Sequence, residues 1–347
     1  MVYLLRYLTL LSLIFLLVLQ IGVKAQDSDP IVEEIFNALT PQERVGQLFL
    51  VSFSGSDFGP DSEVAELIQE YRVGGVILSA SSQNFANDGD TPQQVLDLTS
   101  NLQALAQNPI VSPTLTSTVV TSTPIPLFIA MSHEGDGFPN TQIRNGLPSL
   151  PSQLALAATW NTEDARQVGE TVGRDLSQLG INMLFGPSLD VLDTPRPNQG
   201  SGLGVRTFGG NPFWVGEFGS AYVKGVHQGS NNRLLTIAKH FPGFGSSDRE
   251  INKGVPTILK SLDDLRRVEL SPFFRVTNID NAPPEEIADG VMTAHARYQG
   301  LQGSVPISMD ARNLPALLAL KEIAPWRQAG GLVVSGPLGS PALSLIH

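Results

Sequence analysis

The sequence predicts an α/β fold, a (β/α)8 TIM-type barrel that lacks its last βα unit. Short apolar runs alternate with longer amphipathic stretches along the chain, which is the pattern of parallel strands joined by helices. The runs are continuous in hydrophobicity, as expected for strands that are buried on both faces. Seven such runs favour a barrel over an open doubly wound sheet, which stays the alternative.

The predicted elements follow one another in regular order. A short helical pattern opens the domain at residues 33–39, and the sequence Thr40-Pro41-Gln42-Glu43 is typical of a capped helix start. The apolar runs predicted as strands are residues 48–53, 75–78, 126–131, 181–185, 234–238, 290–294 and 331–334. Helical stretches between them include residues 61–71, 162–179, 211–228, 262–277 and 314–323.

Residues 1–25 are predicted to be a signal peptide. Arg6 supplies positive charge, residues 8–23 are almost entirely apolar, and Val23-Lys24-Ala25 fits the small-x-small pattern before a cleavage site. The alternative is an uncleaved membrane anchor, although the run is shorter than the roughly 20 residues that a span prefers. Either reading predicts a secreted or extracytoplasmic protein, with residues 26–347 as the barrel domain.

Composition narrows the possible partners and chemistries. The chain of 347 residues is 41% hydrophobic and 16% charged, as is usual for a globular protein. A net charge of −11 excludes nucleic acid as an expected partner. The absence of cysteine excludes disulfides, thiolate metal sites and cysteine nucleophiles. Residues 108–125 are rich in Ser, Thr and Pro, which predicts an exposed loop within the domain.

Polar residues gather at the C-terminal ends of the predicted strands. In parallel barrels these ends meet at one face, where active sites are built from the following loops. The sequence therefore predicts a functional site at this face. Its candidates follow the third to sixth runs in chain order, and they are Ser132, Glu134, Asp190, Arg206, Lys239, His240 and His295.

Several other chemistries lack their sequence patterns. His133-Glu134 has no second histidine at the spacing of a zinc-binding helix, and there is no phosphate-binding loop with its lysine. No Gly-x-Ser-x-Gly turn is present to carry a serine nucleophile. No metal ion and no organic cofactor is expected.

Six segments resemble, in the same order, the motifs of one enzyme family, family 3 of the glycoside hydrolases. The resemblance covers nearly all of the chain after residue 25, and it is strongest to the β-N-acetylhexosaminidase and exo-β-glucosidase branches. The segments are residues 126–135 (PLFIAMSHEG), 182–191 (NMLFGPSLDV), 205–212 (VRTFGGNP), 239–245 (KHFPGFG), 291–295 (VMTAH) and 331–338 (GLVVSGPL).

The resemblance implies a retaining exo-hydrolase that removes a terminal β-linked sugar, so the expected partner is a small saccharide or the end of a glycan. In such enzymes an aspartate attacks the anomeric carbon, and a second group protonates the leaving oxygen and later activates water. Residues at family positions that bind the sugar are Ser132, Glu134, Arg206, Lys239, His240 and His295, and those that support the site are Asp190 and Phe244.

The sequence departs from the family at the positions that carry catalysis. The nucleophilic aspartate falls on Gly336, and the aspartate of the third strand falls on Ser132. Phe244 stands where the KHFPGHG motif has its second histidine. Loss of a covalent nucleophile typically costs several powers of ten in rate, so we expect impaired turnover.

The general acid/base is also replaced. The segment that follows the motif carries an Asp-x-His dyad in the hexosaminidase branch, but this chain has Glu250-Ile251-Asn252 there. Asp248 and Glu250 are the remaining candidates for the acid/base. Family barrels continue further past the nucleophile strand than this chain does, which predicts a truncated or decayed copy.

Three functions remain open from the sequence. The first is an exo-glycosidase with reduced activity, and the second is a non-catalytic sugar-binding protein that keeps Arg206, Lys239 and His240. The third is a fragment without a role. Saccharide affinity without turnover would select the second, whereas failure to obtain a soluble folded monomer would select the third.

Overall fold

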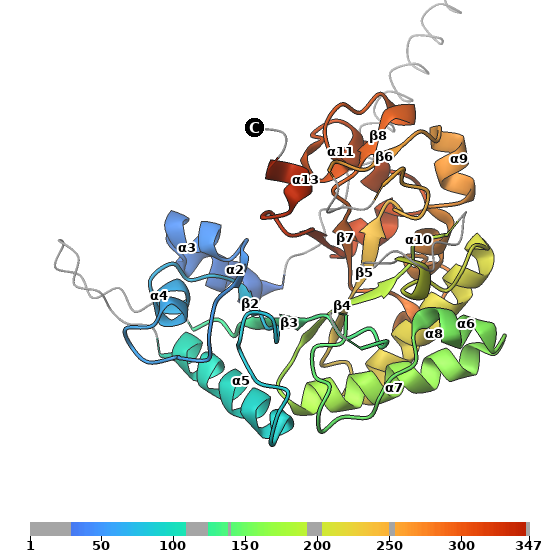
Figure 1. Ribbon diagram of the computed structural model, residues 1–347. Helices are drawn as coiled ribbons and strands as arrows, with labels where there is room; N and C mark the ends of the chain where they lie inside the picture. The colour runs from blue at the N-terminus through green and yellow to red at the C-terminus, as the bar shows by residue number, and fades with distance from the viewer. Residues whose placement is uncertain (1–28, 109–123, 138–139, 193–202, 250–253, 345–347) are drawn as a thin grey trace, which may run out of the picture. The chain divides into compact units, whose positions relative to one another are not determined.

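A computed structural model describes residues 29–108, 124–137, 140–192, 203–249 and 254–344 (Figure 1). The predicted signal peptide, most of the Ser/Thr/Pro-rich segment and Glu250 lie outside the described residues. The chain divides into two compact units, Met1–Ala38 and Leu39–His347. In the first unit the structure describes one helix, α2 (Pro30–Ala38).

The second unit is built on a curved sheet of seven parallel strands, an incomplete TIM-type barrel. Each strand pairs with the next along the order β1-β2-β3-β4-β5-β7-β9, and β1 and β9 form the two edges of the described sheet. All seven predicted strands are present, so the predicted fold class is confirmed. The strands are β1 (Leu50–Ser52), β2 (Gly75–Ile77), β3 (Phe128–Met131), β4 (Met183–Ser188), β5 (Leu235–Phe241), β7 (Gly290–Thr293) and β9 (Leu332–Ser335).

Helices connect these strands and cover the outer face of the sheet. The first ones are α3 (Pro41–Gly46), α4 (Glu63–Gln69), α5 (Thr91–Gln107), α6 (Gln153–Ala158), α7 (Thr162–Gln178) and α8 (Pro212–Ser230). They are followed by α9 (Leu262–Arg267), α10 (Ser271–Val276), α11 (Asn313–Leu318), α12 (Ala324–Gln328) and α13 (Pro341–Ser344). A second, small parallel sheet pairs β6 (Thr257–Ile258) with β8 (Arg297–Tyr298).

One predicted helix is divided in the structure, and another ends earlier than predicted. The stretch 262–277 forms α9 and α10, and 314–323 ends early at α11, with α12 beginning at Ala324. Pro272 and Pro325 each lie in the first turn of the second helix of their pair. Proline lacks the N–H needed inside a helix and its ring displaces the preceding turn, so a new helix begins at each of them.

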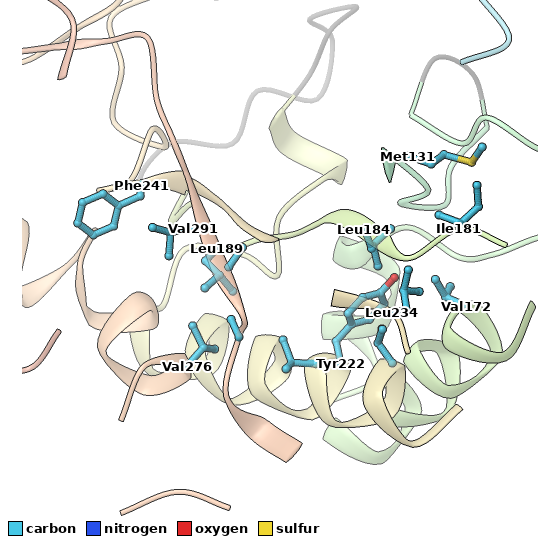
Figure 2. Close-up of a cluster of buried hydrophobic side chains, with 14 of the residues drawn as sticks. Met131, Val172, Ile181, Leu184, Leu189, Tyr222, Leu234, Phe241, Val276 and Val291 are labelled. Carbon is cyan, nitrogen blue, oxygen red and sulfur yellow. The ribbon is translucent and has the colours of Figure 1, made fainter. Parts of the chain in front are cut away.

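Alternation along the strands separates two hydrophobic clusters. Met183 of β4 faces a small cluster with Ala130, Phe185, Ile237 and Met292, whereas its neighbour Leu184 faces the large cluster beneath the helices. Figure 2 shows part of the large cluster, in which Tyr222 of α8 and Val172 of α7 lie close to Leu184. The sheet is therefore buried on both faces, which explains why its strands are continuous apolar runs.

Glycines allow α7 and α8 to cross at backbone contact. A Cβ atom on Gly225 would lie 1.9 Å from the carbonyl oxygen of Arg166, and one on Gly229 would lie 1.9 Å from that of Glu170. From the facing helix, a Cβ on Gly173 would lie 2.2 Å from the carbonyl oxygen of Val226. The obstacles are backbone atoms, so a side chain can be admitted only if the helices move apart.

We expect Gly225→Ala to lower the free energy of unfolding by about 2 kcal/mol, because overpacking outweighs the better helix propensity of alanine. Chemical denaturation of both proteins measures the difference. Gly339→Ala is the control, because a Cβ there meets no atom within 4 Å. Its denaturation midpoint should equal that of the unmodified protein. Equal midpoints for the Gly225 variant and the unmodified protein would contradict the close crossing.

Within the described part of the chain, the helices are all too short or too polar to cross a membrane.

Candidate functional site

The predicted site residues lie at the C-terminal edge of the sheet. Ser132 and Glu134 follow β3, Asp190 follows β4, and Lys239 and His240 are near the end of β5. Because the strands are parallel, these ends meet at one face. His295 follows β7 and Gly336 follows β9 at the same edge.

Glu134 is the centre of a buried ion cluster. Its carboxylate accepts hydrogen bonds from Arg206 Nε at 2.8 Å and Nη2 at 3.3 Å, and it also pairs with Lys239 Nζ. The side chain of Glu134 is 3% exposed. Burial alone would raise the pKa of Glu134, but the charges and hydrogen bonds of Arg206 and Lys239 lower this pKa to about 2. The carboxylate is therefore ionised across the whole physiological range.

The two cations of this cluster keep donors for a ligand. Lys239 Nζ also donates to the carbonyl oxygen of Phe185 at 2.9 Å, which leaves one of its three N–H groups. Within the described residues, Nη1 of Arg206 makes no hydrogen bond, and this side chain is 19% exposed. Donors fixed in this way can orient hydroxyl groups of a polar ligand.

Asp190 organises the segment that follows β5. Its buried carboxylate accepts hydrogen bonds from His240 Nδ1 at 2.7 Å, the backbone N–H of Phe244 at 2.7 Å and Ser188 Oγ at 2.9 Å. Burial alone would raise the pKa of Asp190, but His240 and the hydrogen bonds lower it. Asp190 therefore fixes the ring of His240, whose Nε2 has no hydrogen-bond partner among the residues described.

His295 packs directly against Gly336. Its Nε2 donates to the carbonyl oxygen of Pro337 at 2.9 Å, and its Nδ1 lies 2.7 Å from Ser308 Oγ. Burial lowers the pKa of His295, so the ring is neutral and Nδ1 accepts from the hydroxyl. A Cβ atom on Gly336 would lie 2.9 Å from His295 Nε2. The structure thus brings the imidazole of His295 to the end of β9.

The other predicted residues make fewer contacts with the site. Asp248 pairs with Arg249 Nη2 at 2.6 Å and accepts from the backbone N–H of Thr257 at 2.7 Å. Its side chain is 41% exposed, and the hydrogen bond from Arg249 lowers its pKa. Ser132 is half-buried at the end of β3, and Phe244 packs its ring 6.1 Å from that of His240. Glu250 lies outside the described residues.

A family model supplies the deciding comparison. The model of the glycosyl hydrolase family 3 N-terminal domain matches residues 40–325. The chain belongs to this family. The resemblance to family 3 is therefore confirmed, and the segment 331–338 with Gly336 lies beyond the matched residues.

Curated relatives and solved structures agree with this assignment. The family 3 domain is 30% identical to beta-hexosaminidase A of Pseudoalteromonas piscicida over 73% of this chain and 38% of that protein. It is 28% identical to beta-hexosaminidase LpqI of Mycobacterium tuberculosis over 78% of this chain and 59% of that protein. A family 3 beta-N-acetylglucosaminidase from Paenibacillus sp. str. FPU-7 superposes with a TM-score of 0.70 at 29% identity, over 89% of this chain and 51% of that one. The chain thus spans 38% and 59% of the two curated relatives.

The family 3 domain also uses residues that the sequence did not single out. Glu269 is fully buried and accepts from Ser246 Oγ and Lys260 Nζ, each at 2.6 Å, which fixes the segment after β5. Thr207 Oγ1 donates to the backbone carbonyl of Asp190. A lone acidic residue in the apolar segment VELSPFF is the one signal that could have indicated Glu269.

Among the described residues, no group of three or more His, Asp or Glu side chains is placed to hold a metal ion.

Proposed function

We propose that this family 3 domain binds a terminal β-linked sugar of the N-acetylhexosamine type and hydrolyses its glycosides at a strongly reduced rate. The observation that carries the proposal is the contrast between two parts of one site. The cluster joins the ionised carboxylate of Glu134 to the basic groups of Arg206 and Lys239, whereas Gly336 has no side chain and packs against His295.

Binding is supported by the rigidity of the cluster. Glu134 holds the guanidinium of Arg206 by two hydrogen bonds, so Nη1, which has no partner within the described part of the chain, points in a fixed direction. Asp190 holds His240 in the same way through Nδ1. Donors that are positioned before the ligand arrives lose little entropy on binding. Beta-hexosaminidases among the relatives favour an N-acetylhexosamine as the sugar.

Reduced hydrolysis follows from the carboxylates that remain. Retention of configuration requires one carboxylate to attack the anomeric carbon while a second carboxyl group protonates the leaving oxygen. Glu134 and Asp190 are buried, and each is engaged by cations or N–H donors that stabilise its charge and weaken it as a nucleophile. Asp248 is ion-paired with a lowered pKa, which makes it a poor proton donor near neutral pH.

Calorimetry and a rate assay on the same protein test this function. We expect N-acetylglucosamine to bind with a Kd of roughly 1 mM or tighter, and a chromogenic β-N-acetylglucosaminide to release product far more slowly than a typical glycosidase rate of about 1 s⁻¹. Arg206→Ala should weaken binding at least about tenfold, because it removes both a donor and the partner of Glu134. Arg174→Ala on α7, where the side chain is 49% exposed, is the matched control.

Either half of the proposal can fail separately. Turnover at a typical glycosidase rate of about 1 s⁻¹ or more would mean that another carboxylate is the nucleophile. Folded protein that binds none of a panel of β-linked monosaccharides would remove the saccharide assignment of the cluster.

A further inference from the structure

Three aromatic side chains gather on the surface of the barrel domain. Trp160 is 69% exposed and Phe213 is 61% exposed, and both pack edge-on against Trp214. The ring centroids are 5.6 Å apart for Trp160 and Trp214 and 5.3 Å apart for Phe213 and Trp214. We call this group the aromatic platform. Contiguous exposed aromatic rings are a feature of binding surfaces, whereas single exposed apolar residues are common on any surface.

The platform lies on the face that carries the candidate site. Trp160 lies between α6 and α7, and Phe213 and Trp214 are in the first turn of α8. Both α7 and α8 run antiparallel to the strands that they cover, so they begin at the edge where the strands end (Figure 1). The platform therefore lies at the rim of the face where the strands end, which is the face that carries the candidate site.

A continuous series of rings joins the platform to the ion cluster. Trp214 packs 6.3 Å from Phe218, and Phe218 stacks on Phe208 at 5.7 Å and 22°. Phe208 follows Arg206 by two residues, and Arg206 holds Glu134 at 2.8 Å. The segment that supplies the cation of the sugar site is thus packed on the same aromatic series that supports the surface rings.

The backbone at Trp160 has a conformation that is unusual for a residue with a bulky side chain. Its φ is +56°, in the left-handed region, and its N–H bonds to the carbonyl oxygen of Ala157 just after α6 ends. Glycine is the usual residue at this position of a helix end. A bulky side chain there is strained, and a ring that is 69% exposed gains little burial in return. Strain that folding does not explain is concentrated at ligand sites.

We propose that the aromatic platform is a second subsite, which stacks the pyranose rings of a β-linked glycan beyond the terminal sugar. Equatorial substituents leave the ring faces of such sugars lined with C–H groups, which carry partial positive charge toward the negative face of an aromatic ring. Thr159 and Asn161 flank Trp160, and Asn211 lies two residues before Phe213, so the groups beside the platform are polar and uncharged. The side-chain oxygens of the two asparagines cap α7 and α8, which holds these residues in place beside the rings. This inference rests on the proposed function.

Calorimetry on the full chain with two probes tests the subsite. The probes are N-acetylglucosamine and its β-1,4-linked tetramer, and we expect the tetramer to bind at least tenfold more tightly. Trp160→Gly should weaken tetramer binding about tenfold and change monosaccharide binding less than twofold. Glycine suits the left-handed backbone, so this variant keeps the fold. Phe213→Ala should act in the same direction.

Tyr71→Ala is the matched control. Tyr71 is 55% exposed and precedes β2, at the opposite edge of the sheet, so its loss should change neither affinity. If the monosaccharide binds but the tetramer is no tighter, or Trp160→Gly does not weaken it, the subsite is refuted while the proposed function stands. If the monosaccharide does not bind but tetramer binding is weakened by Trp160→Gly, the sugar pocket is refuted and the subsite is supported. Sedimentation that shows a dimer lost in Trp160→Gly would assign the platform to self-association instead.

Discussion

Substitution of Glu134 by glutamine is expected to lower the free energy of unfolding by about 3–5 kcal/mol, the cost of leaving buried charges without their counter-ion. Lys239 is 4% exposed, and Glu134 is the carboxylate that it contacts. Arg206 would keep one oxygen acceptor in place of two and would lose the negative charge that it pairs with. Chemical denaturation measures the loss, which should be accompanied by loss of sugar binding.

Two further variants identify the unpaired cations as the cause. Glu163→Gln removes a carboxylate from an exposed pair with Arg166, and its effect on stability should be much smaller because water screens the pair. Adding Lys239→Met to Glu134→Gln removes the buried ammonium and should recover part of the lost stability. A Glu134 variant as stable as the Glu163 variant would contradict the buried ion cluster.

The same carboxylate gives a pH dependence with a definite sign. The pKa of Glu134 is about 2 in the folded protein, below the value of an unpaired glutamate, so the unfolded chain binds its proton first as pH falls. Its contribution of about 3 kcal/mol is complete above pH 5 and is lost as pH falls from there toward 2. Denaturation midpoints across this range should fall less for Glu134→Gln than for the unmodified chain.

The strands could be predicted from the sequence because a strand that is buried on both faces is a continuous run of apolar residues. The run 290–294 has only Thr293 as a polar residue, and the observed β7 differs from the prediction by one residue. The ends of the helices were harder to predict from the sequence. The helical pattern of 262–277 continues through Pro272, and only the position of that proline in the first turn of α10 shows where one helix ends and another begins.

The site was predicted as a set of positions but not as a set of contacts. Glu134 and Arg206 are 72 residues apart in sequence, and Asp190 and His240 are 50 apart. Motif spacing places each residue at a strand end, but pairing depends on how the ends meet in space. Trp160 and Trp214 show the same limit more strongly, because neither belongs to a motif and their contact arises from the packing of α7 on α8.

Gly336→Asp is expected to create a nucleophile, with a gain of about a hundredfold or more in cleavage of a dinitrophenyl β-N-acetylglucosaminide. The new carboxylate would bond to the anomeric carbon as the phenolate leaves. A phenolate this stable needs no proton from the protein, so the missing acid/base does not limit this step. Hydrolysis of the glycosyl-enzyme does need a base. We therefore expect a burst of one equivalent of phenolate, and a mass increase of one sugar on the intact protein.

The local geometry decides whether the variant can work. Gly336 is not in the left-handed region, so an aspartate is compatible with its backbone, but its Cβ would lie 2.9 Å from His295 Nε2 and 3.2 Å from the carbonyl oxygen of Thr293. The imidazole must move by a few tenths of an ångström, and His295→Asn provides that room in a double variant. Gly339→Asp adds the same charge three residues away, where a Cβ meets nothing within 4 Å, and should give no burst. Equal bursts at both positions would trace the chemistry to added charge, whereas rapid cleavage by the unmodified chain would show that position 336 is not where the nucleophile belongs.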